Sequence, residues 1–150
     1  VSEARAQFAL LKSLEGEWSG TTQHEGKFEP VRVQYRVSGN GTVVEETLFK
    51  GTPHEMISMY HLDGDRLMMT HYCTTGNQPR MISDASTDDP KSIKFDFLDA
   101  TNMQSDDAMH MHSMHLTLRD PNHLDAWWQS WAKGEPGPEA HFEFTRTAAR

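Results

Sequence analysis

From Gly16 to Arg146, apolar residues recur at every second position in short segments that are separated by turn residues. In the clearest segment, 31–37, three valines and a tyrosine alternate with two arginines and a glutamine. A period of two is typical of a strand with one buried face and one wet face. No stretch between these segments has the pattern of a crossover helix, so consecutive strands are expected to pair antiparallel.

Further strands are expected at 42–49, 56–62, 67–73, 93–97, 108–119, 124–131 and 141–146. The spacing predicts about eight to ten strands in all. Closing them into a barrel removes the exposed edges that such a sheet would otherwise have to protect. The sequence therefore predicts an all-β fold, an antiparallel up-and-down β-barrel. A β-sandwich is the alternative, because periodicity alone does not separate the two.

The segment from Ser2 to Leu14 has a different pattern, with Phe8, Leu11 and Leu14 at helical spacing and Gly16 as a stop signal. We expect a short N-terminal helix whose apolar stripe covers one mouth of the barrel. A chain of 150 residues has room for one hydrophobic core, so residues 1–150 are expected to form a single domain.

The charge of the chain limits its expected partners. Fourteen basic and 22 acidic residues give a net charge of −8, without any basic stripe, which argues against nucleic acid and anionic membrane surfaces. No apolar run approaches the roughly 20 residues that span a bilayer. Cys73 is the single cysteine, so an internal disulfide and a cysteine zinc cage are excluded.

Compartment and assembly are left open by the sequence. The chain is compatible with the cytoplasm, or with the periplasm if a signal peptide has been removed. It is compatible with a monomer or a homodimer.

Histidine and methionine are concentrated in the middle of the chain. All nine methionines and six of the nine histidines lie between His54 and His115. In the densest stretch, His110 and His112 share a strand face with Met114 and Leu116, which is the more apolar of the two faces. Strict alternation therefore places the two imidazoles side by side in the interior, about 7 Å apart at the backbone.

The strands at 56–62 and 67–73 give the best hairpin signal in the chain, with Asp63-Gly64-Asp65 between them. A three-residue turn places His61 near Leu67 and Ile57 near His71. Both histidines then share one face, and up to four imidazoles converge if that face is interior. A change of one residue in the turn would break this alignment.

These residues support several hypotheses. The favoured one is a pocket for a small, mostly apolar molecule, with Arg80 able to pair with a carboxylate or phosphate group. The predicted ligand-binding residues are His61, His71, Tyr72, Asn77, Gln78, Arg80, His110, His112 and Trp128.

Three alternatives remain open. One is an isomerase or hydrolase that uses an interior histidine as acid or base. Another is a zinc or copper site of two or three histidines, with methionine favouring copper(I). The third is that histidine and methionine simply fill an irregular core. The sequence assigns no catalytic residue and no cofactor.

Glu45 and Glu46 are adjacent in an expected strand, so their side chains should point to opposite faces. A buried carboxylate there could serve as a base. We favour a bulge or an exposed pair of carboxylates instead.

The stretch Leu14-Glu15-Gly16-Glu17-Trp18-Ser19-Gly20 resembles the G-x-W opening of lipocalins and their calycin relatives. The resemblance implies that the helix leads into the first strand, that Trp18 packs across the barrel floor and that a late arginine, here Arg146, stacks on it. Residues 60–80 resemble uncharacterised bacterial barrel proteins. Nitrobindin-like haem barrels have a similar shape, but their haem-ligand motif matches no histidine here, so haem is not expected.

Overall fold

The computed structural model describes residues 3–84 and 89–148, so Ser2 of the expected helix lies outside the described part. The elements, in chain order, are α1 (Glu3–Ser13), β1 (Gly16–His24), β2 (Lys27–Ser38), the short 3-10 helix η1 (Gly39–Gly41), β3 (Val43–Leu48), β4 (Met56–Asp63), β5 (Arg66–Tyr72), β6 (Gln78–Ser83), β7 (Ser92–Thr101), β8 (His110–Asp120), β9 (His123–Ala132) and β10 (Glu135–Arg146).

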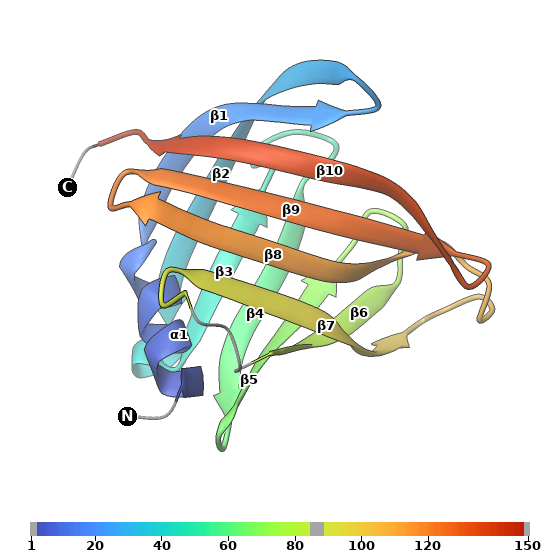
Figure 1. Ribbon diagram of the computed structural model, residues 1–150, viewed down its shortest axis with the longest axis horizontal. Coiled ribbons are helices and arrows are strands. Elements are labelled where there is room, and N and C mark those ends of the chain that lie inside the picture. The colour runs from blue at the N-terminus through green and yellow to red at the C-terminus, as the bar shows by residue number, and fades with distance from the viewer. Residues whose placement is uncertain (1–2, 85–88, 149–150) are drawn as a thin grey trace.

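The ten strands form one closed barrel in which every strand pairs with its sequence neighbours (Figure 1). All pairs are antiparallel, and β1 closes the ring on β10 in a register that runs from Trp18 opposite Arg146 to His24 opposite Ala140. The prediction of an all-β, up-and-down antiparallel barrel is confirmed, and the sandwich is excluded.

A close backbone approach marks the seam between β1 and β10. Gly20 pairs with Phe144, and a Cβ atom at position 20 would lie 1.8 Å from the carbonyl oxygen of Glu143. The seam can therefore close in this register only with glycine at position 20.

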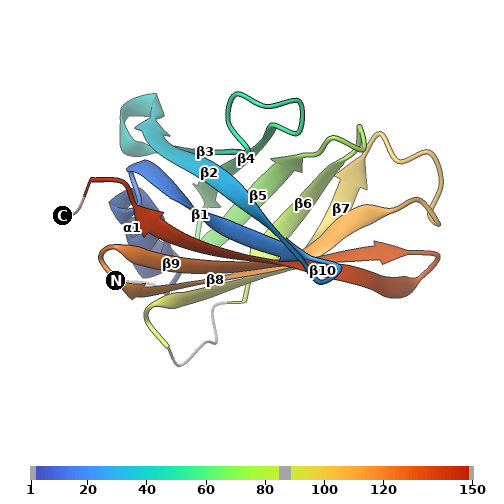
Figure 2. The same cartoon turned by 90° about the horizontal axis from the view of Figure 1, so that it is seen from above.

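The helix α1 lies at one end of the barrel, where it contacts β2, β4 and β5 (Figures 1 and 2). Its residues Ala4, Phe8 and Leu11 are buried in the hydrophobic core, as its apolar spacing predicts. Within the described residues, no helix has the length and apolar character needed to cross a membrane.

Arg146 ties the two ends of the chain together. Its guanidinium lies 4.3 Å from the centre of the Trp18 ring, so the stacked pair that the resemblance implies is confirmed. The same group donates hydrogen bonds to the carbonyl oxygens of Ser13 (3.0 Å), Glu15 (2.9 Å) and Pro121 (3.1 Å). One side chain therefore joins the end of α1, the first strand, the β8–β9 turn and the last strand.

The β4–β5 hairpin has a shorter turn than the sequence analysis assumed. Asp63 pairs with Arg66, which leaves a two-residue loop, and the register shifts by one position. His71 is therefore opposite Ser58, while His61 is opposite Met68. The prediction that His61 and His71 share a face is wrong, because a slip of one residue turns one strand's side chains to the other face.

A β-bulge interrupts the alternation in β8. The register with β9 shifts between Met111 and Ser113, so His112 is an extra residue without a partner position. From Met114 onward the predicted inward face is observed, with Met114, Leu116 and Leu118 buried. Before the bulge the parity changes, and the side chain that faces the interior is that of Met111.

Replacing Arg146 with alanine should destabilise the barrel by about 3 kcal/mol. The carbonyl groups of Ser13, Glu15 and Pro121 lose their charged hydrogen-bond donor, and Trp18 loses the guanidinium group stacked on its ring. Urea unfolding measures the effect. Arg66→Ala is the matched control, since Arg66 pairs with Asp63 on the exposed hairpin, where solvent screens the interaction and its loss should change stability far less. Equal losses in the two variants would contradict the role assigned to Arg146.

Candidate functional site

The barrel is packed at the helix end and hollow at the other end. The hollow is a cavity of about 390 Å³ near the β1–β2 turn and the far ends of the neighbouring strands. Its lining residues are Thr22, Lys27, Glu29, Leu48, Phe49, His54, Met56, His71, Thr74, Met111, Trp128, Ala140 and Phe142.

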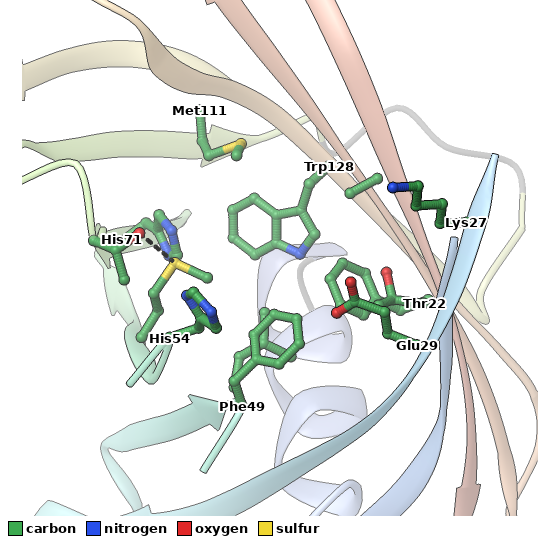
Figure 3. A pocket seen from close by; sticks show the side chains of 13 residues that line it. Thr22, Lys27, Glu29, Phe49, His54, His71, Met111 and Trp128 are labelled. Carbon is green, nitrogen blue, oxygen red and sulfur yellow. Dashed lines mark hydrogen bonds between the residues drawn. The ribbon is translucent and has the colours of Figure 1, made fainter. Parts of the chain in front are cut away.

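Most of the cavity wall is apolar. In Figure 3, Trp128 and Phe49 face the centre of the space, with His54 and His71 on one side and Thr22, Lys27 and Glu29 on the other. The ring of Phe49 packs edge-on against Phe142, with 6.0 Å between the ring centres. An apolar wall with a few polar groups is the usual composition of a small-molecule site.

Phe49 reaches the cavity through an unusual backbone conformation. It has a φ of +55°, a left-handed conformation that a bulky residue rarely adopts. Its amide donates a 2.9 Å hydrogen bond to the carbonyl oxygen of Arg32, which fixes the backbone where β3 ends. Such local strain persists where surrounding structure holds it in place, and it is frequent at binding sites.

His71 is the buried polar group of the cavity. Its side chain lines the hollow, its residue is 2% exposed, and its ring lies 4.6 Å from the ring of Trp128. Its Nδ1 atom shares a 2.9 Å hydrogen bond with the hydroxyl of Ser58. The second ring nitrogen, Nε2, makes no hydrogen bond to the described residues, and because His71 lines the cavity this is the atom left for a ligand.

Burial lowers the pKa of His71 from 6.5 to about 4, because the surrounding protein disfavours the charged imidazolium. The ring is therefore neutral at pH 7. In a neutral imidazole, Nε2 either accepts or donates a hydrogen bond, and the tautomer decides which.

A row of polar side chains runs from His71 into the packed half of the barrel. Tyr35, Glu46, Ser58 and His71 lie directly opposite one another on the successive strands β2, β3, β4 and β5. All four residues are buried. Glu46 Oε2 accepts hydrogen bonds from the hydroxyl of Tyr35 (2.8 Å) and from that of Tyr60 (3.0 Å).

In this polar region Tyr35 and Tyr60 are hydrogen-bond donors and Glu46 is their acceptor. Burial raises the pKa of Glu46, while hydrogen bonds from Tyr35, Tyr60 and Ser58 oppose that rise. Burial raises the pKa of both tyrosines well above 10, and the neighbouring Glu46 carboxylate raises them further. The tyrosines therefore remain protonated donors to Glu46 across the neutral pH range.

Ser58 lies between Glu46 and His71: its hydroxyl is hydrogen-bonded to His71 Nδ1 and also lowers the pKa of Glu46, whose Oε1 atom is buried without a hydrogen-bond partner among the described residues. If Ser58 donates to Glu46, His71 must hold its own proton at Nδ1, and Nε2 faces the cavity as an acceptor. If Ser58 donates to His71 Nδ1, Nε2 carries the proton and is a donor. The state of Glu46 thus biases the hydrogen-bonding character that the cavity presents.

Of the residues predicted from the sequence, His71 and Trp128 line the cavity. His61 and Tyr72 are exposed on the outer face. Arg80 is also outside, where its guanidinium pairs with Asp99 through two hydrogen bonds of 2.7 and 2.6 Å. The structure does not bring these three side chains together with His71.

Asn77 and Gln78 hold the loop between β5 and β6. The Asn77 side chain donates to the carbonyl oxygen of Met109 (2.9 Å), and Gln78 donates to that of Gly76 (3.1 Å). Neither residue lines the cavity. Gln78 also accepts a 2.7 Å hydrogen bond from the hydroxyl of Thr101 at the end of β7, so these contacts connect the loop to β7, to the segment before β8 and to itself.

His110 and His112 form a separate cluster beside the bulge. His110 Nε2 lies 2.9 Å from His112 Nδ1, and His110 Nδ1 lies 3.0 Å from the carbonyl oxygen of Ala108. The His112 ring is stacked between Phe97 and Trp131, at 4.6 and 4.1 Å. Three of the four ring nitrogens thus have partners, so the arrangement does not favour a metal, and neither residue lines the cavity.

Sequence reasoning missed the residues that support His71. Glu46 is 4% exposed and interior, which corrects the preference for a bulge or an exposed pair, while Glu45 lies 3.9 Å from Arg36 on the outer side. A two-residue turn at Gly64-Asp65 would have placed Ser58 opposite His71 and revealed the contact. The inward turn of Phe49 has no comparable signal in the sequence.

Comparison with known proteins supports the barrel fold of this chain. No known protein family and no curated protein matches the sequence. The structure is similar to that of Rv2717c from M. tuberculosis, with a TM-score of 0.65, 16% identity, and 95% and 98% of the two chains covered. That likeness establishes a shared barrel architecture.

Two looser matches are a DUF3598 family protein of unknown function from Nostoc punctiforme and a redesigned β-barrel. The first has a TM-score of 0.49 and 11% identity, covering 91% of this chain and 49% of the other. The second has a TM-score of 0.41 and 12% identity, covering 93% and 96%.

The neutral state of His71 predicts a pH-dependent stability. In the unfolded chain the histidine binds a proton below its ordinary pKa of 6.5, whereas in the folded barrel it binds one only near pH 4. Its contribution is therefore present above pH 6.5 and lost as the pH falls toward 4, by about 2 kcal/mol between pH 7 and 5.

Urea unfolding at both pH values measures this contribution by comparison of the wild type with His71→Phe. The variant should lose about 2 kcal/mol less than the wild type on acidification. His61→Gln, at an exposed position in the same hairpin, is the control and should behave like the wild type. An unchanged pH dependence in His71→Phe would show that the ring titrates normally.

Proposed function

We propose that this barrel binds a small, mostly apolar molecule in its cavity, with one hydrogen bond to His71 Nε2. The observation that carries the proposal is a neutral, buried imidazole that lines an apolar cavity of about 390 Å³ with one ring nitrogen unused. The volume lies within the usual range of small-molecule sites, about 300–1,000 Å³.

The wall favours a neutral ligand. Trp128, Phe49 and Phe142 supply aromatic surface, while Lys27 provides the permanent positive charge among the lining residues and lies near the β1–β2 turn. A ligand anion deep in the cavity would lose its hydration without gaining an opposite charge beside His71. Arg80, which sequence reasoning assigned to an anionic group, is paired with Asp99 outside.

A lipocalin-like (calycin) relationship is part of the same proposal. It is supported by the opening helix that leads into Trp18 and by the stacking of Arg146 on that ring.

A second candidate is a proton-transfer enzyme, such as an isomerase, in the same cavity. The polar row supports it, because Glu46 and Ser58 can bias His71 toward the tautomer with a free lone pair at Nε2. A neutral, desolvated histidine is a competent general base when a substrate proton lies within hydrogen-bonding reach.

Binding of 2-naphthol and of 2-methylnaphthalene tests the first candidate. The two probes have nearly the same shape, but only the naphthol can hydrogen-bond to His71. The naphthol should bind about tenfold more tightly, because methylnaphthalene leaves Nε2 buried without a partner. Isothermal titration calorimetry measures both affinities.

Three variants separate the contributions to binding. His71→Phe should bind the two probes equally, and Ala140→Trp should bind neither because the indole fills the cavity. Tyr72→Phe is the matched control, since its side chain is the next along β5 and lies outside the barrel. Failure of the wild type to bind either probe, or unchanged binding in Ala140→Trp, would contradict the proposal.

Deuterium exchange into 2-tetralone tests the second candidate. This apolar ketone has acidic C–H bonds next to its carbonyl, and NMR in D₂O follows their exchange. An acid–base site should accelerate exchange at least about 100-fold over buffer, and His71→Phe should abolish that excess. Exchange at the buffer rate would contradict the enzyme, and tight probe binding in the same protein would support the binding function alone.

A further inference from the structure

A second polar cluster lies on the outer wall of the barrel, away from the cavity. Asp125 on β9 lies directly opposite Glu143 on β10, and His141 is two positions farther along β10. The residues that alternate with them, Ala140 and Phe142, line the cavity. Because successive side chains of a strand point to opposite faces, the three polar side chains project outward.

Three possible metal-ligand atoms of this cluster lie close together. One ligand atom from each of Asp125, His141 and Glu143 lies within 4.8 Å of the others. Among the described residues, Asp125 Oδ1 and His141 Nε2 are buried and have no hydrogen-bond partner. Asp125 as a whole is 9% exposed. Two buried polar atoms without partners in one cluster are costly unless a further group satisfies them.

Neighbouring side chains hold the cluster in place. The ring of Trp127 is stacked on His141 at 4.5 Å with an angle of 5° between the planes, which fixes the imidazole. Arg119 pairs with Asp125 Oδ2 at 3.0 Å, which orients the carboxylate and leaves Oδ1 available. A carboxylate held by a neighbouring donor, as Asp125 is by Arg119, is typical of carboxylates that bind metal ions.

We propose that Asp125, His141 and Glu143 form a binding site for a divalent transition-metal ion on the outer wall. One imidazole and two carboxylates are ligands suited to zinc, which binds three protein groups and keeps a fourth position open. Glu143 is exposed, so the open position faces solvent. This site is separate from the cavity and from the His110–His112 pair, and it does not depend on the proposed function.

Zinc binding to the EDTA-treated protein tests this proposal, with calorimetry and elemental analysis after dialysis as readouts. The protein should bind one zinc ion per chain. His141→Gln and Glu143→Gln each remove one ligand and should each weaken zinc binding at least tenfold. Urea unfolding of each variant shows that the barrel is intact.

Two controls locate the ion. His115 is the other histidine stacked on Trp127, with 5.1 Å between the two ring centres. The variant His115→Gln should leave the zinc affinity unchanged. The double variant His110→Gln/His112→Gln should also retain the site. Absence of stoichiometric zinc, affinity unchanged in both His141→Gln and Glu143→Gln, or loss of zinc only in the double variant would each overturn the proposal.

Discussion

The closure of the sheet between its first and last strands is the constraint on which the rest of this structure depends. Gly20 lets β1 and β10 approach, and Arg146 joins the end of α1, the β8–β9 turn and the Trp18 ring. Once the ring is closed, alternate side chains of every strand must point inward. The helix and the large core side chains fill one end, and the other end keeps a hollow.

The boundary between the packed half and the hollow half is polar. The buried carboxyl group of Glu46 accepts hydrogen bonds at Oε2 from hydroxyl groups on both neighbouring strands, while its Oε1 atom has no partner among the described residues. Ser58 extends that arrangement to His71, which keeps the imidazole fixed and neutral at the cavity wall. The same cross-strand geometry that closes the barrel thus sets the chemistry available to a ligand.

Much of the architecture could be predicted from the sequence, because the alternation of apolar residues and the turn residues are local signals. The contact between Trp18 and Arg146, which are far apart in the chain, was expected only from the resemblance to lipocalins. The site was predicted only in part. His71 and Trp128 were predicted and line the cavity. The β4–β5 turn is one residue shorter than assumed, so His61 and His71 point to opposite faces of the sheet. The extra residue at His112 changes the alternation in β8, so Met111 faces the cavity in place of His110 and His112. Turn length and bulges depend on tertiary packing, and periodicity does not reveal them.

A crystal structure of the complex with 2-naphthol is the decisive measurement for the proposal that the hollow half of the barrel holds an apolar molecule against His71. We expect the naphthyl ring between Trp128 and Phe49, with its oxygen about 2.6–3.1 Å from His71 Nε2. A naphthol molecule bound only on the outer surface, or a cavity closed by side chains with His71 turned away from it, would contradict the proposed binding site.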